Sequence, residues 1–299
     1  MAVKNMAASV LTRLKNQSKK EGIPFQMVLQ LFAQEEFLRK LAISEYAENL
    51  ILKGGMFIYT LTEFDSRPTK DIDFLLKNLH GSLDSIKQTM QEICNISTGN
   101  DFITLDVLDA ETITADMEYP GVRTSFMGRI GKVKIPFSID VGIDDVIVPN
   151  PVKRSIKTRL PEFKAPEVYT YSLESTIAEK FDSILKRMDG TSRMKDFYDI
   201  YYLSGMYDFD GEVLYEAIHS TLTHRNREQP ADVFADIAEF VNSSVLNTRW
   251  GAFDPAKETG LQFSIVIDRL IVFLEPIYLN MLRGDEFDKQ WKCGIKSWI

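Results

Sequence analysis

The spacing of apolar residues changes twice along the 299-residue chain, and this change limits the possible folds more than any other feature. Between Ala8 and about Leu52, apolar residues recur every three or four positions, which predicts amphipathic helices. Short runs of β-branched and aromatic residues replace this pattern up to Val148 and predict strands. From Ser172 onward the helical spacing returns, and no segment there predicts a strand convincingly. A mixed α/β section between two helical sections is therefore expected.

Four runs in the middle section have the character of strands, namely residues 72–76, 103–107, 124–127 and 134–143. A stretch with helical spacing, residues 81–94, interrupts them. Gly22 and Pro24 separate two helices in the opening section, because a flexible residue ends one helix and proline suits the start of another. A proline-rich connector precedes the second helical section, with prolines at positions 149, 151, 161 and 166.

Composition narrows the possible partners. The net charge of −8 has the wrong sign for a protein that coats nucleic acid non-specifically, so any contact with RNA or DNA must be local. One basic run in the connector is the candidate for such a contact, with a solvated surface as the alternative: Lys153, Arg154, Lys157, Arg159 and Lys164. The two cysteines have no metal-site spacing, and no uncharged stretch approaches the length of a membrane span. We expect a cytoplasmic protein without a membrane segment.

Two aspartates separated by one apolar residue begin the first predicted strand. Side chains two positions apart in a strand share a face, so Asp71 and Asp73 converge while Ile72 packs beneath them. Close carboxylates repel each other unless a cation or proton intervenes, and Mg²⁺ prefers oxygen ligands. A third acid, Asp140, occupies a position where the alternation of its own run predicts an inward apolar side chain, which is costly for an unpaired charge. A shared metal site would explain all three.

A pair of glycines precedes a predicted helix upstream of these acids. Glycine lets backbone N–H groups approach an anion, and the dipole at a helix N-terminus favours a phosphate. Gly54 and Gly55 therefore suggest a phosphate-binding turn. The loop that enters the strand of paired aspartates adds two cations and a hydroxyl for phosphate oxygens, at Arg67, Thr69 and Lys70.

Each of these features also has a purely structural interpretation. The D-x-D motif is short and common, so Asp71 and Asp73 could be a solvated strand end and Asp140 could cap a loop. The combination favours function, because paired glycines before a helix and then two close acids suit a triphosphate with its metal ion.

Segments 52–55, 67–74 and 139–142 resemble the nucleotidyltransferases related to DNA polymerase beta, and more narrowly the AbiEii/AbiGii abortive-infection toxin family. In that superfamily a glycine pair, a D-x-D and a later aspartate form a two-metal site. The resemblance continues to about Leu203 through segments 178–181 and 193–201, which resemble the family's two downstream motifs. Met56 departs from the pattern, because a small or hydroxyl residue often follows the glycines.

The downstream motifs supply further candidates. Lys180 falls at the edge of an apolar stripe, where a lysine either covers apolar surface with its stem or meets a phosphate. Arg193 begins a helix, where the dipole disfavours a cation, so an external anion explains it better. Asp196 is expected to orient Arg193 or Lys180, or to act on the acceptor hydroxyl. Lys195 and Asp199, four positions apart, have a surface ion pair as the alternative.

The resemblance implies an α+β fold, with a nucleotidyltransferase-type mixed sheet flanked by helices, an N-terminal helical segment and a C-terminal helical domain. The expected bounds are residues 1–50 for a helical segment packed on the core, 51–165 for the α/β core and 166–299 for the helical domain.

The reaction implied is the transfer of NMP from an NTP to a hydroxyl, with release of pyrophosphate and with Mg²⁺ or Mn²⁺ as cofactor. The predicted catalytic residues are Asp71, Asp73, Asp140, Lys180 and Asp196, the first three as metal ligands. The predicted NTP-binding residues are Lys53, Gly54, Gly55, Arg67, Thr69, Lys180, Arg193 and Lys195.

The resemblance also implies a biological setting, the toxin of a toxin–antitoxin or phage-defence pair. Its partners would be an antitoxin protein from a neighbouring gene and an acceptor RNA such as the 3′ end of tRNA. Two other functions remain open. One is nucleotidyl transfer to a small molecule such as an antibiotic, and the other is a regulator that binds NTP without turnover. The complete set of acids and cations favours an enzyme.

Overall fold

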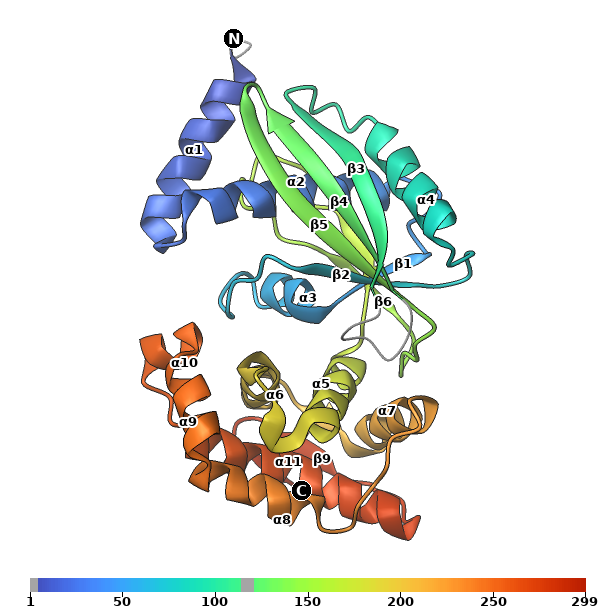
Figure 1. The fold of residues 1–299 in the computed structure, drawn as a ribbon, viewed down its shortest axis with the longest axis vertical. Helices are drawn as coiled ribbons and strands as arrows, with labels where there is room; N and C mark the ends of the chain where they lie inside the picture. The colour runs from blue at the N-terminus through green and yellow to red at the C-terminus, as the bar shows by residue number, and fades with distance from the viewer. Residues whose placement is uncertain (1–4, 114–120) are drawn as a thin grey trace. The chain divides into compact units, whose positions relative to one another are not determined.

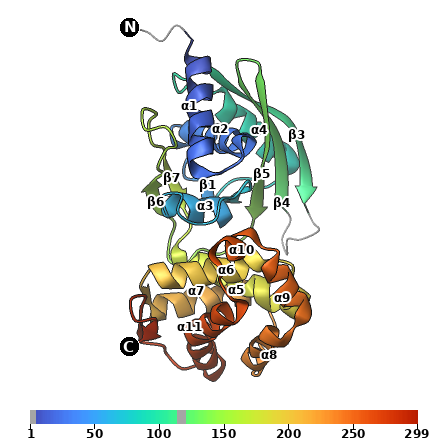
Figure 2. The same ribbon diagram turned by 90° about the vertical axis from the view of Figure 1, so that its left-hand side faces the viewer.

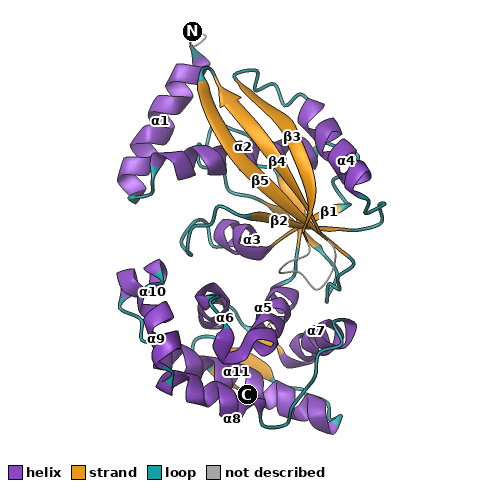
Figure 3. Cartoon of the chain, viewed as in Figure 1, coloured by secondary structure: helices purple, strands orange, loops and turns teal. Residues whose placement is uncertain are grey.

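The computed structural model describes residues 5–113 and 121–299, which form two compact units. The first unit comprises Met1–Asp144 and Pro151–Tyr171, and the second comprises Asp145–Asn150 and Ser172–Ile299. Figure 1 follows the chain through both units, and Figure 3 shows that the first mixes strands and helices while the second is mainly helical.

The first unit is a mixed sheet with helices. Its helices are α1 (Met6–Glu21), α2 (Phe25–Ala42), α3 (Gly54–Leu61) and α4 (Leu83–Asn95). Its strands are β1 (Leu50–Lys53), β2 (Ile72–Leu76), β3 (Ile103–Ile113), β4 (Gly121–Ile130), β5 (Val133–Ile143), β6 (Val152–Ser155) and β7 (Glu167–Thr170). They lie in the order β3-β4-β5-β2-β1-β7-β6. The pairs β2/β5 and β1/β7 are parallel and the others antiparallel, which confirms the predicted α+β fold.

Alternation along the long strands determines which face of the sheet is covered. On β5, Ile135, Phe137, Ile139 and Val141 are buried, and the residues between them are more exposed. Helix α2 packs on β3, β5 and β7, α4 packs on β3 and β4, and α1 packs on α2 (Figure 2). The apolar face of the sheet therefore lies against the helices, and the opposite face carries the polar side chains.

Buried charges connect the two N-terminal helices to α3 and to the segment after β6. The Glu35 carboxylate on α2 accepts hydrogen bonds from the Arg159 backbone N–H at 3.1 and 3.3 Å. The Arg159 guanidinium donates to the Tyr59 hydroxyl at 2.6 Å and to Glu21 at 2.9 Å. Burial raises the pKa of Glu35 to about 7, although the charges of Arg39 and Arg159 oppose the shift. This network connects α1, α2, α3 and the segment after β6.

The predicted ends of several elements differ from the observed ones. Strand 72–76 matches β2, and Gly22 ends α1 in the left-handed region, with φ +69°. Strands β3 and β4 are longer than predicted, and β1, β6 and β7 were not predicted as strands. Strand β7 pairs with β1, and the first compact unit accordingly extends to Tyr171.

The second unit is built around α11 (Phe263–Arg283). The other helices are α5 (Leu173–Arg187), α6 (Met194–Met206), α7 (Gly211–His224), α8 (Val233–Glu239), α9 (Ser244–Gly251) and α10 (Asp254–Thr259), with 3₁₀ turns at Met188–Gly190 and Phe240–Asn242. The expectation that this half has no strand is wrong. A small antiparallel sheet joins β8 (Phe209–Asp210), β9 (Gln290–Lys292) and β10 (Ser297–Trp298).

Aromatic packing explains these short strands. Trp291 on β9 is fully buried, and its indole N–H donates to the Ser204 carbonyl at 2.7 Å. Its ring lies 4.7 Å from the ring of Phe273 on α11. The strands are too short to produce an alternating pattern, so sequence periodicity did not reveal them. Among the helices that the structure describes, none is long and apolar enough to cross a membrane.

Candidate active site

Asp73 and Asp140 are direct neighbours in the sheet. Strands β2 and β5 are parallel, and the two aspartates are Cα partners in their register. Neighbouring strands lie about 4.8 Å apart, so the two side chains leave the same face of the sheet close together. Asp71 directly precedes β2, two residues before Asp73. The pairing therefore brings the later single aspartate beside the D-x-D motif.

The orientation predicted for Asp140 is wrong, although its position beside the motif agrees with the proposal. The residues on either side, Ile139 and Val141, are the ones that point into the apolar core. The Asp140 side chain is 17% exposed and lies on the opposite, polar face. Its charge is therefore not buried in the apolar core, and the cost of burial does not distinguish it.

Arg123 on β4 is a charged residue of this site that the sequence analysis missed. It is the cross-strand partner of Asp140, and its Nε and Nη2 donate to the two carboxylate oxygens at 2.8 and 2.7 Å. These hydrogen bonds and the nearby charges of Asp140, Glu111 and Asp71 raise the pKa of Arg123 above its ordinary value, against the effect of burial. The tight turn at Gly131 and Lys132 fixes this register and was the available signal.

Lys53 completes a row of four charges across four neighbouring strands. It is the register partner of Asp73 on β1, and its ammonium lies 5.2 Å from the centre of the Tyr171 ring. We call Lys53, Asp73, Asp140 and Arg123 the charged row. Directly opposed residues on neighbouring strands share a face, so two carboxylates are flanked by a cation at each end.

The glycine pair begins α3, as predicted, and lies against this row. Gly54 has φ +69°, and a Cβ added there would overlap the Asp73 carboxylate oxygen and lie 3.1 Å from its carbon. A Cβ at Gly55 would lie 3.1 Å from the Thr69 hydroxyl and 3.4 Å from the Arg67 guanidinium. Glycine is therefore required here for close approach. The structure brings the predicted phosphate-binding residues of the first unit together with Asp73.

The loop before β2 is held in place from both sides. The buried Thr69 hydroxyl accepts a hydrogen bond from the Asp71 backbone N–H at 3.3 Å. The carbonyl of Lys70 accepts from the side-chain amides of Gln30 and Gln34 on α2, at 2.9 and 2.8 Å. This anchoring fixes the point at which the chain enters β2 and so positions the paired aspartates.

The first unit contains oxygen ligands for a divalent cation, but their side chains are not gathered closely enough to form a complete metal site in the described residues. Within residues 5–113 and 121–299, no three His, Cys, Asp or Glu side chains are already close enough together to bind a metal ion. The residues nevertheless fit such an ion, because Asp73 and Asp140 are hard oxygen donors on adjacent strands. The backbone of Gly54 approaches the Asp73 carboxylate too closely to leave room for a Cβ, so the glycine turn lies directly next to these donors.

The candidates from the downstream motifs form a second cluster, inside the helical unit. The Lys180 ammonium on α5 donates to Asp196 at 3.0 Å and lies 3.4 Å from Asp199. Arg193 Nε and the Ser183 hydroxyl both donate to the other Asp196 oxygen at 2.7 Å. Burial of Asp196 disfavours its charge, but the cations Lys180 and Arg193 outweigh burial and hold its pKa below the ordinary value.

This cluster answers part of the question left open by the sequence. Asp196 contacts both Lys180 and Arg193, so it is placed to orient either one. Asp199 is only 1% exposed, so the alternative of a surface ion pair for it is wrong. Lys180 lies at the edge of the apolar stripe of α5. Its whole side chain is buried, so the stem is covered together with the ammonium group.

The basic run in the connector is not one continuous basic surface. Arg159 is buried in the network with Glu35, and the Arg154 guanidinium donates to the Tyr171 carbonyl at 3.1 Å. Lys157 pairs with Glu63 at 2.5 Å. The contacts of Arg154 and Arg159 explain these two cations by the fold of the first unit, and this weakens the case for a nucleic-acid surface there.

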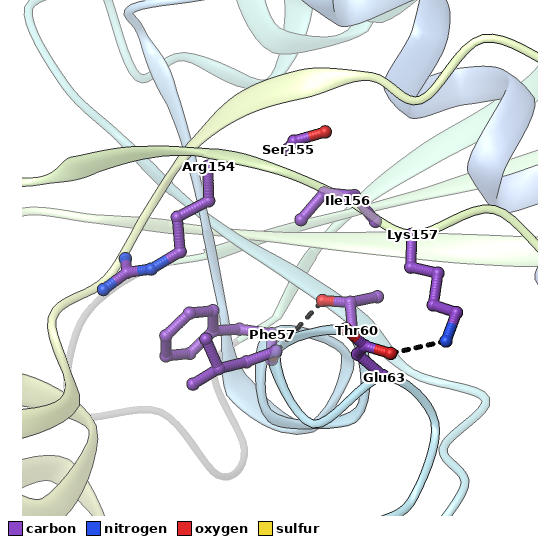
Figure 4. Close-up of a pocket in the computed structure, with 8 residues that line it drawn as sticks. Phe57, Thr60, Glu63, Arg154, Ser155, Ile156 and Lys157 are labelled. Atoms are coloured by element: carbon purple, nitrogen blue, oxygen red, sulfur yellow. Dashed lines mark hydrogen bonds and ion pairs between the residues drawn. The ribbon is translucent and has the colours of Figure 1, made fainter. Parts of the chain in front are cut away.

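A small cavity of about 130 Å³ lies between α3 and β6 (Figure 4). Phe57 and Thr60 line it from the helix, Arg154 lines it from the strand, and Ile156 lines it from just after the strand. The ion pair between Lys157 and Glu63 lies at its rim. The cavity is too small for a nucleotide, since ligand pockets are usually several hundred Å³.

Comparison with solved structures shows what the fold of this chain is similar to. MenT4, a nucleotidyltransferase toxin from Mycobacterium tuberculosis H37Rv, aligns with a TM-score of 0.51 and 15% identity, over 78% of this chain and 77% of that chain. JHP933 from Helicobacter pylori aligns with a TM-score of 0.48 and 16% identity, over 86% of this chain and 98% of that one. None of the curated proteins matches the sequence.

The family follows from the sequence itself. The model of the family described as nucleotidyl transferase AbiEii toxin, type IV toxin–antitoxin system, matches residues 36–289. The chain therefore belongs to the AbiEii nucleotidyltransferase toxin family. The match continues well beyond Leu203, where the resemblance seen in the motifs ended.

Proposed function

We propose that this protein transfers NMP from an NTP to an acceptor hydroxyl at the charged row. The acceptor oxygen bonds to the α-phosphorus, the bond from that phosphorus to the oxygen that bridges to the β-phosphorus breaks, and pyrophosphate leaves with that electron pair while the hydroxyl proton passes to water. The observation that carries the proposal is the pairing of Asp73 with Asp140 beside the glycine turn that begins α3.

In this proposal, different residues of the first unit bind the divalent cation and the phosphates of the nucleotide. Asp71, Asp73 and Asp140 would hold the divalent cation, which would act as a Lewis acid and neutralise charge on the triphosphate and on the leaving pyrophosphate. The backbone N–H groups at Gly54 and Gly55 bind phosphate oxygens at the N-terminus of α3. Lys53, Arg67 and Thr69 lie around this turn and donate to the same anion.

The roles proposed for residues of the helical unit are based on the resemblance of their segments to the family's downstream motifs. Lys180, Arg193 and Lys195 bind the phosphates in this proposal, and Asp196 keeps Lys180 and Arg193 charged and oriented. The hydrogen bonds from both cations to Asp196 support the orienting role. Within its own unit, the cluster also stabilises the contact between α5 and α6.

We propose that the acceptor is an RNA, such as the 3′ end of tRNA. We also propose that the partner is an antitoxin protein encoded by a neighbouring gene. Membership of a family of type IV toxin–antitoxin systems supports both the toxin role and the partner. The transfer would stop growth by blocking a hydroxyl that translation needs. A role in phage defence follows from the same family as part of this proposal.

The decisive experiment incubates the purified chain with each α-labelled NTP and total RNA, with Mg²⁺ or Mn²⁺. Wild-type protein is expected to label RNA, and Asp73→Asn is expected not to. Asp106→Asn is the control, because Asp106 lies on β3, half-exposed and paired with Arg129 outside the charged row. No labelled RNA from wild-type protein, with any of the four nucleotides, would contradict the proposal.

Two further outcomes identify the alternatives. Label that appears on a small molecule, identified by mass spectrometry, would favour transfer to such an acceptor. Tight NTP binding without release of pyrophosphate would favour a regulator. Expression in growing cells adds a second measure, because Asp71→Ala and Asp73→Ala should each remove growth arrest.

A further inference from the structure

We propose that Arg123 is a phosphate-binding residue that exchanges partners during nucleotide binding: it pairs with Asp140 before a cation is bound and turns to the nucleotide phosphates when Asp140 binds the cation. This inference rests on the proposed function, because it assigns a role to a residue of the same site. It adds a substrate-binding residue that the sequence motifs do not contain.

The geometry of the pair is the first argument. Arg123 uses two N–H groups and engages both oxygens of Asp140, so it takes up a lone pair on each oxygen that a cation could otherwise use. A guanidinium charge beside the carboxylate also repels any cation that approaches it. Arg123 and a divalent ion therefore compete for Asp140.

The exposure of the two side chains is the second argument. Arg123 is 42% exposed and Asp140 is 17% exposed. The guanidinium can leave the carboxylate for water or for a phosphate without unpacking the core. A buried arginine such as Arg159, whose side chain is fully covered, has no such freedom.

The position of the pair in the charged row is the third argument. Asp140 lies between Arg123 on β4 and Asp73 on β2. Without a cation, Arg123 reduces the repulsion between the two carboxylates. When a cation takes over that task, the released guanidinium keeps several donors in a planar fork, which matches phosphate oxygens. Binding of the cation and of the nucleotide is then coupled through one side chain.

Arg129 provides a matched control on the same strand. It is 41% exposed, pairs with Asp106 on β3 and lies on the same face as Arg123, because the two arginines are six positions apart, an even number. Six residues of strand place it about 20 Å from Arg123, outside the site. Arg129→Ala therefore removes an equivalent cation and an equivalent ion pair without touching the charged row.

The test measures Mn²⁺ binding to the full-length chain by titration with detection of free Mn²⁺ by electron paramagnetic resonance. Wild type, Arg123→Ala, Arg123→Lys, Arg129→Ala and Asp73→Asn are compared, with and without α,β-methylene analogues of the four NTPs. Without nucleotide, Arg123→Ala should bind Mn²⁺ about tenfold more tightly than wild type, because one repelling charge near the ion is gone. Arg129→Ala should match wild type, and Arg123→Lys should fall between wild type and Arg123→Ala.

With nucleotide, the order should change. The analogue should strengthen Mn²⁺ binding by wild type more than by Arg123→Ala, because only wild type gains a contact between the released guanidinium and a phosphate. Equal or weaker Mn²⁺ binding by folded Arg123→Ala without nucleotide would overturn the inference, as would equal strengthening in both proteins. Mn²⁺ binding by Asp73→Asn that matches wild type would instead contradict the proposed function. Thermal unfolding of each variant shows that it is folded.

Discussion

Asp73 and Asp140 lie opposite each other on the parallel strands β2 and β5, although 66 positions separate them in the chain. Only the parallel pairing of these two strands produces the juxtaposition, because β3 and β4 intervene in sequence but not in space. Two like charges so close together destabilise the folded state unless something compensates them. Arg123 compensates Asp140, and the proposed cation would compensate both.

The first prediction follows from this repulsion. Asp73→Asn should lower nucleotidyl transfer by at least about 100-fold, which corresponds to about 2.7 kcal/mol of transition-state stabilisation. It should lower the free energy of unfolding by no more than about 1 kcal/mol, because the change removes a repelling charge. Pyrophosphate release and urea denaturation measure the two effects. A loss of activity that merely follows a loss of folded protein would contradict the prediction, and Asp106→Asn is the control.

The second prediction concerns pH. The pKa of Glu35 is 4.5 in the unfolded chain and about 7 in the folded one, so the folded state binds its proton more tightly. Its contribution to stability is therefore complete below pH 4.5 and declines as the pH rises to about 7. Glu35→Gln should abolish this decline, which amounts to at most about 3 kcal/mol.

Urea denaturation of wild type and Glu35→Gln between pH 4.5 and 8 provides the measurement for Glu35. The exposed Glu63 on the same unit is the control, and Glu63→Gln should leave the pH dependence of wild type unchanged. A difference between wild type and Glu35→Gln that stays constant over this range would show that Glu35 ionises normally.

Much of the fold could be predicted because local patterns carry it. The ends of β2 and the separation of α1 from α2 at Gly22 depend on alternation and on turn residues, which are visible in a short window. Strand β1, by contrast, has four residues that are all largely covered, and it follows directly on helical spacing. Its identity depends on pairing with β2 and β7, which a short window does not contain.

Some residues of the candidate site could likewise be identified from local sequence, whereas others depend on strand pairing. Asp71, Asp73 and the glycines form recognisable motifs, so the sequence singles them out. Arg123 belongs to no motif. The turn after β4 places it opposite Asp140, and only this placement makes it part of the site. The same register shows that Asp140 points away from the core. The pairing of β4 with β5 must be known before the position of Arg123 opposite Asp140 can be deduced.

The third prediction separates stability from catalysis in the helical unit. Lys180→Met leaves Asp196 buried with one partner fewer and should lower the free energy of unfolding by about 3 kcal/mol. Adding Asp196→Asn removes the unpaired charge, so the double variant should be less destabilised than the sum of the single changes by at least about 1 kcal/mol. Transfer activity should stay lost in the double variant. Recovery of activity together with stability would show that Lys180 has only a structural role.

The fourth prediction compares two glycines with the same backbone conformation. Gly54 and Gly22 both have φ +69°, which costs an L residue about 1 to 2 kcal/mol. A Cβ at Gly54 would overlap the Asp73 carboxylate, whereas in the described part of the chain no atom lies within 4 Å of a Cβ added at Gly22. Both alanine variants should therefore lose similar stability from backbone strain, but only Gly54→Ala should displace Asp73. Mn²⁺ binding and pyrophosphate release should fall in Gly54→Ala and stay at the wild-type level in Gly22→Ala. Equal activity in the two folded variants would mean that the close contact between Gly54 and Asp73 does not matter for the site.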